Sequence, residues 1–169
     1  MNEYIWLFPT LFMLHEMEEI CGFGIWLKKN MPMLEKRFPN IAKEYSDYSN
    51  EGFAAAVFEE FILLFIICII SRCTDFYGLW LGGLIAFAFH MAVHIIQSAV
   101  IRKYIPALAT SVLALPPSVW LIARSVKLID LSTVRIVIFS AVGIFIVALN
   151  LKLAHILMDK TTKFIKRQL

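Results

Sequence analysis

The sequence predicts an all-α fold, a polytopic transmembrane bundle of about five helices. Three observations indicate this fold, and two of them concern the composition. Of the 169 residues, 60% are hydrophobic and only 17% are charged, whereas soluble domains average about 45–50% and about 25%. The third indication is that the apolar residues fall in runs of about 17–25, the length of a helix that crosses a bilayer. The length predicts a single integral membrane domain over 1–169.

Five apolar runs are long enough to span a bilayer, and we place them at about 4–27, 53–71, 76–101, 104–123 and 134–157. Pro116 and Pro117 interrupt the fourth run, and proline can kink or end a helix. The N-terminus lacks the basic region of a cleavable signal peptide, so we expect the first run to be retained. The connection 28–52 is expected on the membrane surface, with a short interfacial helix at 31–38.

The distribution of basic residues predicts how the bundle is oriented. Most of the 16 Lys and Arg residues lie in the connection 28–52, in the turn 102–103 and in the tail after 157. Five spans put these segments on one face, and loops rich in Lys and Arg stay in the cytoplasm. We therefore expect the N-terminus outside and the C-terminus in the cytoplasm, in contact with the lipid of a bacterial inner membrane. The net charge of +3 is too small and too scattered for nucleic-acid binding.

A small-xxx-small pattern lies in the third span, where Gly78 and Gly82 are followed by Gly83. Such glycines let another helix approach closely. We expect this to be packing inside the bundle, and a homodimer interface is the alternative.

Ionisable side chains are unusually frequent inside the predicted spans. Each costs roughly 2.5–3.5 kcal/mol on insertion scales and marks a functional site by default. The set comprises His15, Glu16, Glu18, Glu19, Glu59, Glu60, His90, His94 and His155. Any one alone is most simply a hydrogen-bonded packing residue, which we favour for Glu16 and His155. The set together exceeds what packing needs and indicates a site.

In the first span, the motif His15-Glu16-Met17-Glu18-Glu19 puts three polar side chains on one face. At about 100° per residue, Glu18 lies about 60° to one side of His15 and Glu19 about 40° to the other. Glu16 points elsewhere in this projection. We therefore expect the histidine and the last two glutamates to act together.

The second and third spans contribute two further pairs. His90 and His94 are one helical turn apart, a spacing at which two imidazoles can bind one metal ion. Glu59 and Glu60 are adjacent, so one of them faces inward, and the sequence leaves open which. At about 1.5 Å per residue, these groups and Asn150 of the fifth span all lie roughly 9–18 Å from the cytoplasmic ends of their spans. The sequence thus predicts one polar layer in the cytoplasmic half of the bilayer.

This layer has the donors of a metal site. Imidazole and carboxylate together suit zinc, iron or manganese, and helical bundles with several such groups can hold two ions, so we expect one or two divalent ions. The candidate ligands are His15, Glu18, Glu19, Glu59, Glu60, His90 and His94. Glu18 is also the candidate catalytic base, while Tyr104 and Arg102, at the cytoplasmic mouth, are the candidates for positioning a substrate.

The chain resembles the HXXEE family of small bacterial membrane proteins, whose name describes the motif at 15–19. The resemblance extends to the paired histidines of the third span and to the segment 104–107, Tyr-Ile-Pro-Ala, which is similar to the family's Tyr-x-Pro-Gly. Ala107 stands where the family usually has glycine. The resemblance covers most of the chain and implies that the histidine and the last two glutamates of the motif are the key residues, with Glu16 variable. It implies no activity.

Our leading hypothesis is a metal-dependent intramembrane enzyme, a hydrolase or an oxidoreductase, that acts on a lipid-like or amphipathic substrate. Two alternatives stay open. One is a small proton-coupled transporter that uses the buried His and Glu side chains as a proton relay. The other is a non-catalytic accessory or immunity protein of the membrane, in which the buried carboxylates affect stability only.

Overall fold

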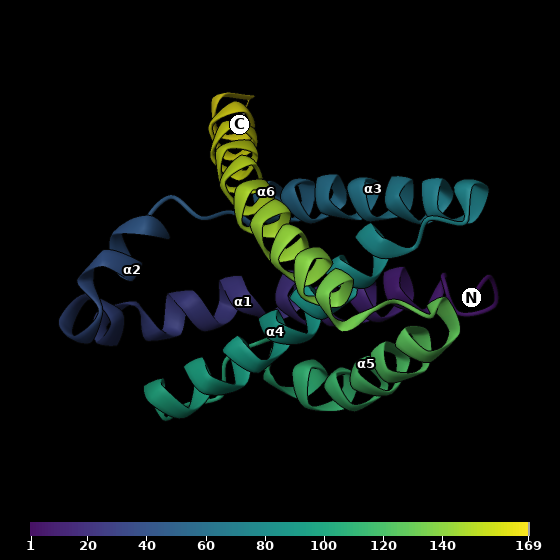
Figure 1. Ribbon diagram of the computed structural model, residues 1–169. Helices are drawn as coiled ribbons and strands as arrows, with labels where there is room; N and C mark the ends of the chain where they lie inside the picture. The colour runs from purple at the N-terminus through teal and green to yellow at the C-terminus, as the bar shows by residue number, and fades with distance from the viewer. Residues whose placement is uncertain (169) are drawn as a thin grey trace.

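The computed structural model describes residues 1–168, and six α-helices account for most of them. In chain order these are α1 (Leu7–Arg37), α2 (Pro39–Glu44), α3 (Asn50–Thr74), α4 (Gly78–Ile101), α5 (Leu108–Ile129) and α6 (Thr133–Gln168). No β-strand occurs in this part of the chain. The helices α1 and α3 run side by side, and α6 crosses the bundle obliquely (Figure 1). The prediction of an all-α bundle is confirmed.

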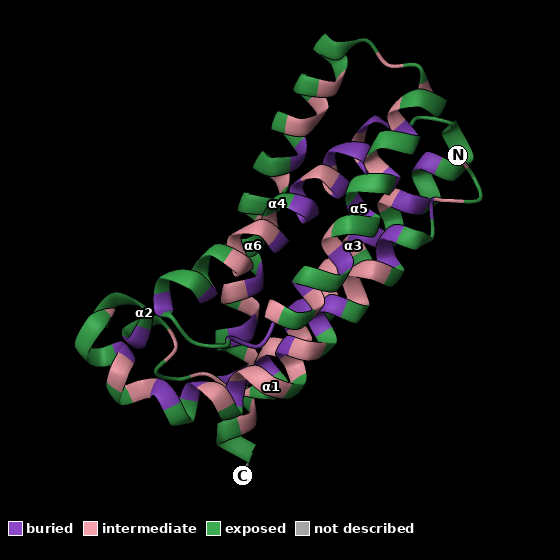
Figure 2. Cartoon of the chain, turned by 90° about the horizontal axis from the view of Figure 1, so that it is seen from below, coloured by how far each residue is buried: buried purple, intermediate pink, exposed green. Residues whose placement is uncertain are grey.

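Four of the helices, α3 to α6, are long and apolar enough to cross a membrane. The 31-residue α1 carries three glutamates in its middle, but two of them, Glu16 and Glu19, are buried inside the bundle. The chain is thus an integral membrane protein with four to five spanning helices. Its termini lie at opposite ends of the elongated bundle (Figure 2). Which end faces the cytoplasm, and which membrane holds the protein, stay predictions.

Several helix boundaries differ from the predicted spans. The helix α1 continues to Arg37, through most of the segment 31–38 where we expected a separate interfacial helix, and the short helix α2 follows it instead. This extension is stabilised because Leu34 of α1 is buried in one apolar cluster with Ala42 of α2. The helix α5 begins at Leu108 and continues through Pro116 and Pro117. Membrane helices tolerate internal proline because neighbouring groups satisfy the freed carbonyls.

The helices α4 and α6 cross at a contact between glycines. A Cβ added to Gly82 would lie 2.2 Å from the carbonyl oxygen of Phe139, and one added to Gly143 would lie 2.3 Å from the backbone of Gly82. Gly78 packs on the ring of Phe139 in the same way. The small-xxx-small pattern therefore serves packing within the bundle, as predicted. A homodimer stays a prediction.

The helices α1 and α4 are fixed to one another at the end of the bundle near the N-terminus. Trp80 is fully buried and donates its Nε1–H to the carbonyl of Ile5 at 3.1 Å. Its ring packs edge-on against Phe8 with the centroids 6.0 Å apart. This anchor sets the register of α1 against α4, and the polar residues follow about two turns further along α1 and about three turns further along α4.

Candidate metal centre

Three histidines and one glutamate converge between α1 and α4. One ligand atom each of His15, Glu19, His90 and His94 lies within 4.8 Å of all the others, and we call these four residues the His/Glu group. The Nε2 atoms of His90 and His94 are 2.8 Å apart. Glu19 Oε1 lies 3.1 Å from His94 Nε2 and 3.5 Å from His15 Nε2. The structure thus brings together the histidine pair of α4 with two residues of the α1 motif.

The His/Glu group is buried and its polar atoms are incompletely paired. His15 is 0% and Glu19 8% exposed. His15 Nε2 and Glu19 Oε1 have no hydrogen-bond partner among the described residues, because the close approach of Glu19 to His94 lacks hydrogen-bond alignment. A buried polar atom without a partner costs about 1–3 kcal/mol. A cation between these atoms would satisfy both at once.

Thr110 of α5 determines which nitrogen of His15 faces the group. Its hydroxyl donates to Glu18 Oε2 at 2.5 Å, so at His15 Nδ1, 3.1 Å away, it acts as the acceptor. The His15 tautomer with its proton on Nδ1 fits this contact, and it would leave the lone pair of Nε2 directed at the group. Metal-bound histidines commonly donate their other N–H to a neighbour in this way.

Glu18 lies outside the His/Glu group and faces α5. Its carboxylate accepts hydrogen bonds from the backbone N–H of Thr110 at 2.7 Å and of Ala109 at 3.3 Å, and from the hydroxyl of Tyr104. The first N–H groups of a helix have no intrahelical partner, and a negative charge there is favourable, so Glu18 caps α5 from another helix. Adjacent residues diverge by about 100° around a helix, which is why Glu18 and Glu19 serve different neighbours. A role of Glu18 as ligand or base stays a prediction.

A stripe on α1 binds the connection between α4 and α5. It begins at Glu18 and continues at intervals of four residues, which keeps its members on one helix face. Further along the stripe, Gly22 packs against the Pro106 ring. Trp26 donates its Nε1–H to the Tyr104 carbonyl at 2.5 Å. Asn30 Oδ1 accepts a hydrogen bond from Lys103 Nζ at 2.8 Å. Our sequence analysis missed this stripe, although its four-residue spacing is visible in the sequence.

The same connection contains Ala107, Tyr104 and Arg102. Ala107 is the N-cap of α5 with φ 113° and ψ −24°, so the tight turn forms with alanine at the family's glycine position. The hydrogen bond to Glu18 raises the pKa of Tyr104 to about 12, which keeps the phenol a donor. Arg102 is exposed and ends α4 with φ 58°. Neither Tyr104 nor Arg102 is among the described residues that line the cavity, and their role in positioning substrate stays a prediction.

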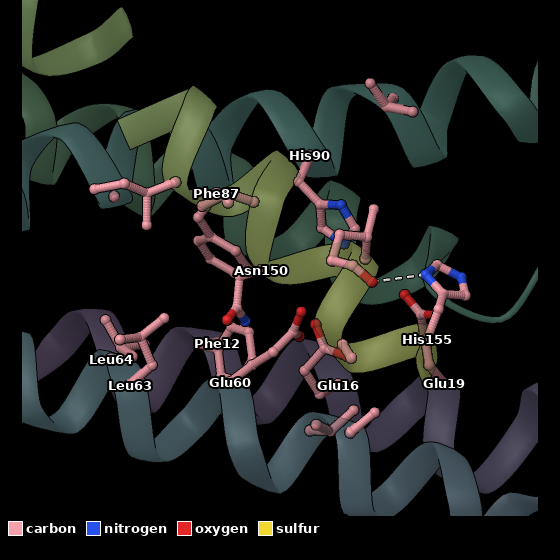
Figure 3. Close-up of a pocket in the computed structure, with 18 of the residues that line it drawn as sticks. Phe12, Glu16, Glu19, Glu60, Leu63, Leu64, Phe87, His90, Asn150 and His155 are labelled. Carbon is pink, nitrogen blue, oxygen red and sulfur yellow. Dashed lines mark hydrogen bonds between the residues drawn. The ribbon is translucent and has the colours of Figure 1, made fainter. Parts of the chain in front are cut away.

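Three members of the His/Glu group, Glu19, His90 and His94, line a cavity of about 340 Å³ between α1, α3, α4 and α6, and His15 lies behind them. Glu16 and Glu60 line this cavity as well (Figure 3). We expected Glu16 to point away from the site, and this is wrong: it is only 5% exposed and faces the cavity. Glu16 lies about 60° from Glu19 around the helix, and the polar face of α1 is centred nearer Glu19 than His15.

The adjacent glutamates Glu59 and Glu60 of α3 both make contact with this interior, one of them through Asn150. Glu60 lines the cavity, while Glu59 accepts a hydrogen bond at 3.2 Å from Asn150 Nδ2 of α6, itself a lining residue. Both glutamates lie outside the His/Glu group. His155 also lines the cavity, but its Nδ1 lies 2.7 Å from the Leu151 carbonyl and its Nε2 lies 3.5 Å from Glu44.

The chain matches the family described as "Protein of unknown function with HXXEE motif" over residues 6–121. The match covers more than half of the chain, which therefore belongs to this family. It includes the whole His/Glu group and the start of α5, and it ends before α6. No curated protein and no solved structure matches the chain.

Proposed function

We propose that this protein is a metal-dependent enzyme of the membrane interior that acts on a lipid-like or amphipathic molecule. The observation that carries the proposal is the His/Glu group, four donor side chains from two helices, three of which line a largely apolar cavity. Metal ligands and a substrate space are then adjacent, which is the arrangement that metal-assisted catalysis requires.

The spacing of the donor atoms supports a single ion. Ligand atoms about 2.0–2.1 Å from a tetrahedral zinc ion lie roughly 3.3 Å from one another. Three of the six separations in the His/Glu group are 2.8, 3.1 and 3.5 Å, on either side of that value, and the donor atoms all lie within 4.8 Å of one another. Imidazole with carboxylate also suits iron and manganese. An ion that takes six ligands would keep two positions free for water or substrate.

Other residues of the chain can supply proton transfer and a water-poor environment for such a reaction. Glu16 and Glu60 line the cavity beside the group without belonging to it, so they are the carboxylates available to accept or donate a proton. The aromatic and aliphatic walls exclude water, which strengthens electrostatic interactions inside the cavity. A bound ion that keeps a coordination position free beyond the protein donors would supply Lewis acidity and a bound water of lowered pKa. Hydrolysis and oxidation are both within this proposal.

A proton-coupled transporter is the second candidate function. One observation favours it: titratable side chains line the cavity from Glu16 and Glu60 to His155, next to Glu44. Such a series resembles the proton relays of membrane transporters. A pH-dependent proton flux across the membrane of liposomes that contain the metal-free protein would support the transporter and count against the enzyme.

Elemental analysis of the detergent-purified protein tests the metal proposal. We expect about one equivalent of zinc, iron or manganese in the wild type, and its loss in the double variant His90→Ala/His94→Ala. The control is His155→Ala, which removes a histidine from the same cavity but outside the His/Glu group, and it should keep the metal. Equal metal content in the double variant and the wild type, or no metal in either after reconstitution, would refute the proposal.

A further inference from the structure

The cavity extends beyond the His/Glu group as an apolar arm between four helices. The arm is lined by Phe8 and Phe12 of α1, Ile67 of α3, Leu79 and Gly83 of α4, and Val147 of α6. In Figure 3 the apolar side chains of Leu63 and Leu64 lie on the opposite side of Glu60 from Glu16 and Glu19. The cavity therefore has a polar end and an apolar end.

The dimensions of the arm fit one hydrocarbon chain. Glu16 and Phe8 are eight residues apart on α1, and His90 and Leu79 are eleven apart on α4, which at about 1.5 Å per residue gives roughly 12 and 16 Å. The arm is narrow, since a Cβ added to Gly83 would already lie 3.3 Å from the Phe8 ring. The cavity of about 340 Å³ is at the small end of the range of about 300–1,000 Å³ for ligand pockets.

The charge of the polar end restricts the headgroup. Three carboxylates line it, those of Glu16, Glu19 and Glu60, and the described lining residues include neither lysine nor arginine. An anionic headgroup would therefore leave water without a cationic side chain to pair with, and an unpaired charge is costly to bury. A hydroxyl can donate to a carboxylate and offer its oxygen to a metal ion.

We infer that the cavity binds a single-chain lipid with an uncharged hydroxyl headgroup, with the headgroup at the His/Glu group and the chain along the apolar arm. This inference rests on the proposed function, because it names the substrate class of that site. It excludes fatty acids and phospholipids as the preferred occupants.

Binding of radiolabelled dodecanol to the metal-loaded protein in nanodiscs tests the inference. Unlabelled dodecanol should displace the label, and dodecanoate should be at least about tenfold weaker at neutral pH. Dioleoylglycerol carries the same headgroup chemistry on two chains and should not compete. Equal competition by dodecanoate or by dioleoylglycerol would overturn the inference, as would a wild type that does not bind dodecanol.

Two variants that fill the arm locate the binding. Val147→Phe and Gly83→Leu should each weaken dodecanol binding at least about tenfold while metal content stays at the wild-type value. The control is Val137→Phe, the same substitution on the same helix at a position that is 62% exposed, and it should bind normally. Undiminished binding in both filled variants would overturn the inference.

Metal content measured on the same samples separates the two proposals. Dodecanol binding without any metal would refute the enzyme and leave the inferred lipid class standing. A full metal complement without dodecanol binding would refute the lipid class and leave the enzyme standing.

Discussion

His15 of α1 and Thr110 of α5 share a hydrogen bond of 3.1 Å between Nδ1 and Oγ1, and it orients the histidine toward the His/Glu group. The hydroxyl of Thr110 is held by Glu18 on its other side. The motif residue Glu18 thus acts on the candidate metal centre through a second helix, without contributing a ligand atom to the group.

Thr110→Val should weaken metal binding by about 10–100-fold, because it removes the acceptor that fixes the tautomer and ring orientation of His15. Valine keeps the shape of threonine, so the packing of α5 is preserved. Metal affinity is measured by competition with a chelator. Thr110→Ser retains the hydroxyl and should bind like the wild type. Equal affinities of the valine and serine variants would refute this role of Thr110.

Glu18→Gln and Glu19→Gln make the same change at adjacent positions and should have different effects. Glu19→Gln should reduce metal affinity at least about tenfold, since it removes an anionic donor from the His/Glu group. Glu18→Gln leaves all four donors of the His/Glu group in place and an amide oxygen that can accept from Thr110, so it should keep a full metal complement. It should lower the free energy of unfolding by about 1 kcal/mol, because the start of α5 loses a charged cap. Metal content and thermal unfolding of both variants check this. The reverse pattern, with metal lost only in Glu18→Gln, would contradict the assignment.

Ala107→Gly should stabilise the protein. Ala107 has φ 113°, and a left-handed conformation costs a residue with a Cβ roughly 1–2 kcal/mol. Loss of its buried methyl group offsets only about 0.8 kcal/mol of that. The expected result is a small rise in Tm. Ala123→Gly, at an exposed position inside α5, should lower Tm instead, and a similar fall in both variants would show that the turn is unstrained.

Gly82→Ala and Gly83→Ala should differ strongly although the residues are neighbours. A Cβ on Gly82 meets the backbone oxygen of Phe139 at 2.2 Å, whereas one on Gly83 meets only the ring of Phe8, at 3.3 Å. Overpacking against backbone costs about 1–3 kcal/mol, and an aromatic side chain can shift. Thermal unfolding should therefore show a clear loss for Gly82→Ala and little change for Gly83→Ala. Equal losses would argue against the close crossing of α4 and α6.

Much of the fold can be predicted from the sequence because membrane-spanning helices are recognisable by their length and hydropathy. The meeting of His15, Glu19, His90 and His94 was also predictable, because the i, i+4 spacing of the histidines and the common depth of both helices are properties of the sequence. The helical pattern did not predict that Glu16 faces the cavity. A helical projection gives the angles between side chains of one helix but not the directions in which neighbouring helices lie.

The boundaries near the α4–α5 connection were less predictable for a similar reason. Residues 104–107 are apolar enough to extend a span, yet the left-handed Ala107 and the cap from Glu18 start α5 at Leu108. That start depends on a contact between positions 18 and 109–110, which are far apart in the sequence. Local propensity carries no information about such a contact.

X-ray absorption spectroscopy of the metal-loaded protein tests directly whether the His/Glu group holds the ion. We expect a first shell of nitrogen and oxygen atoms, at about 2.0–2.1 Å if the ion is zinc, with the multiple scattering of three imidazole rings. This imidazole signal should fall in the Thr110→Val variant, in which His15 is no longer oriented. A shell that contains sulfur at about 2.3 Å, or one without imidazole scattering, would contradict the assignment of His15, Glu19, His90 and His94 as a metal site.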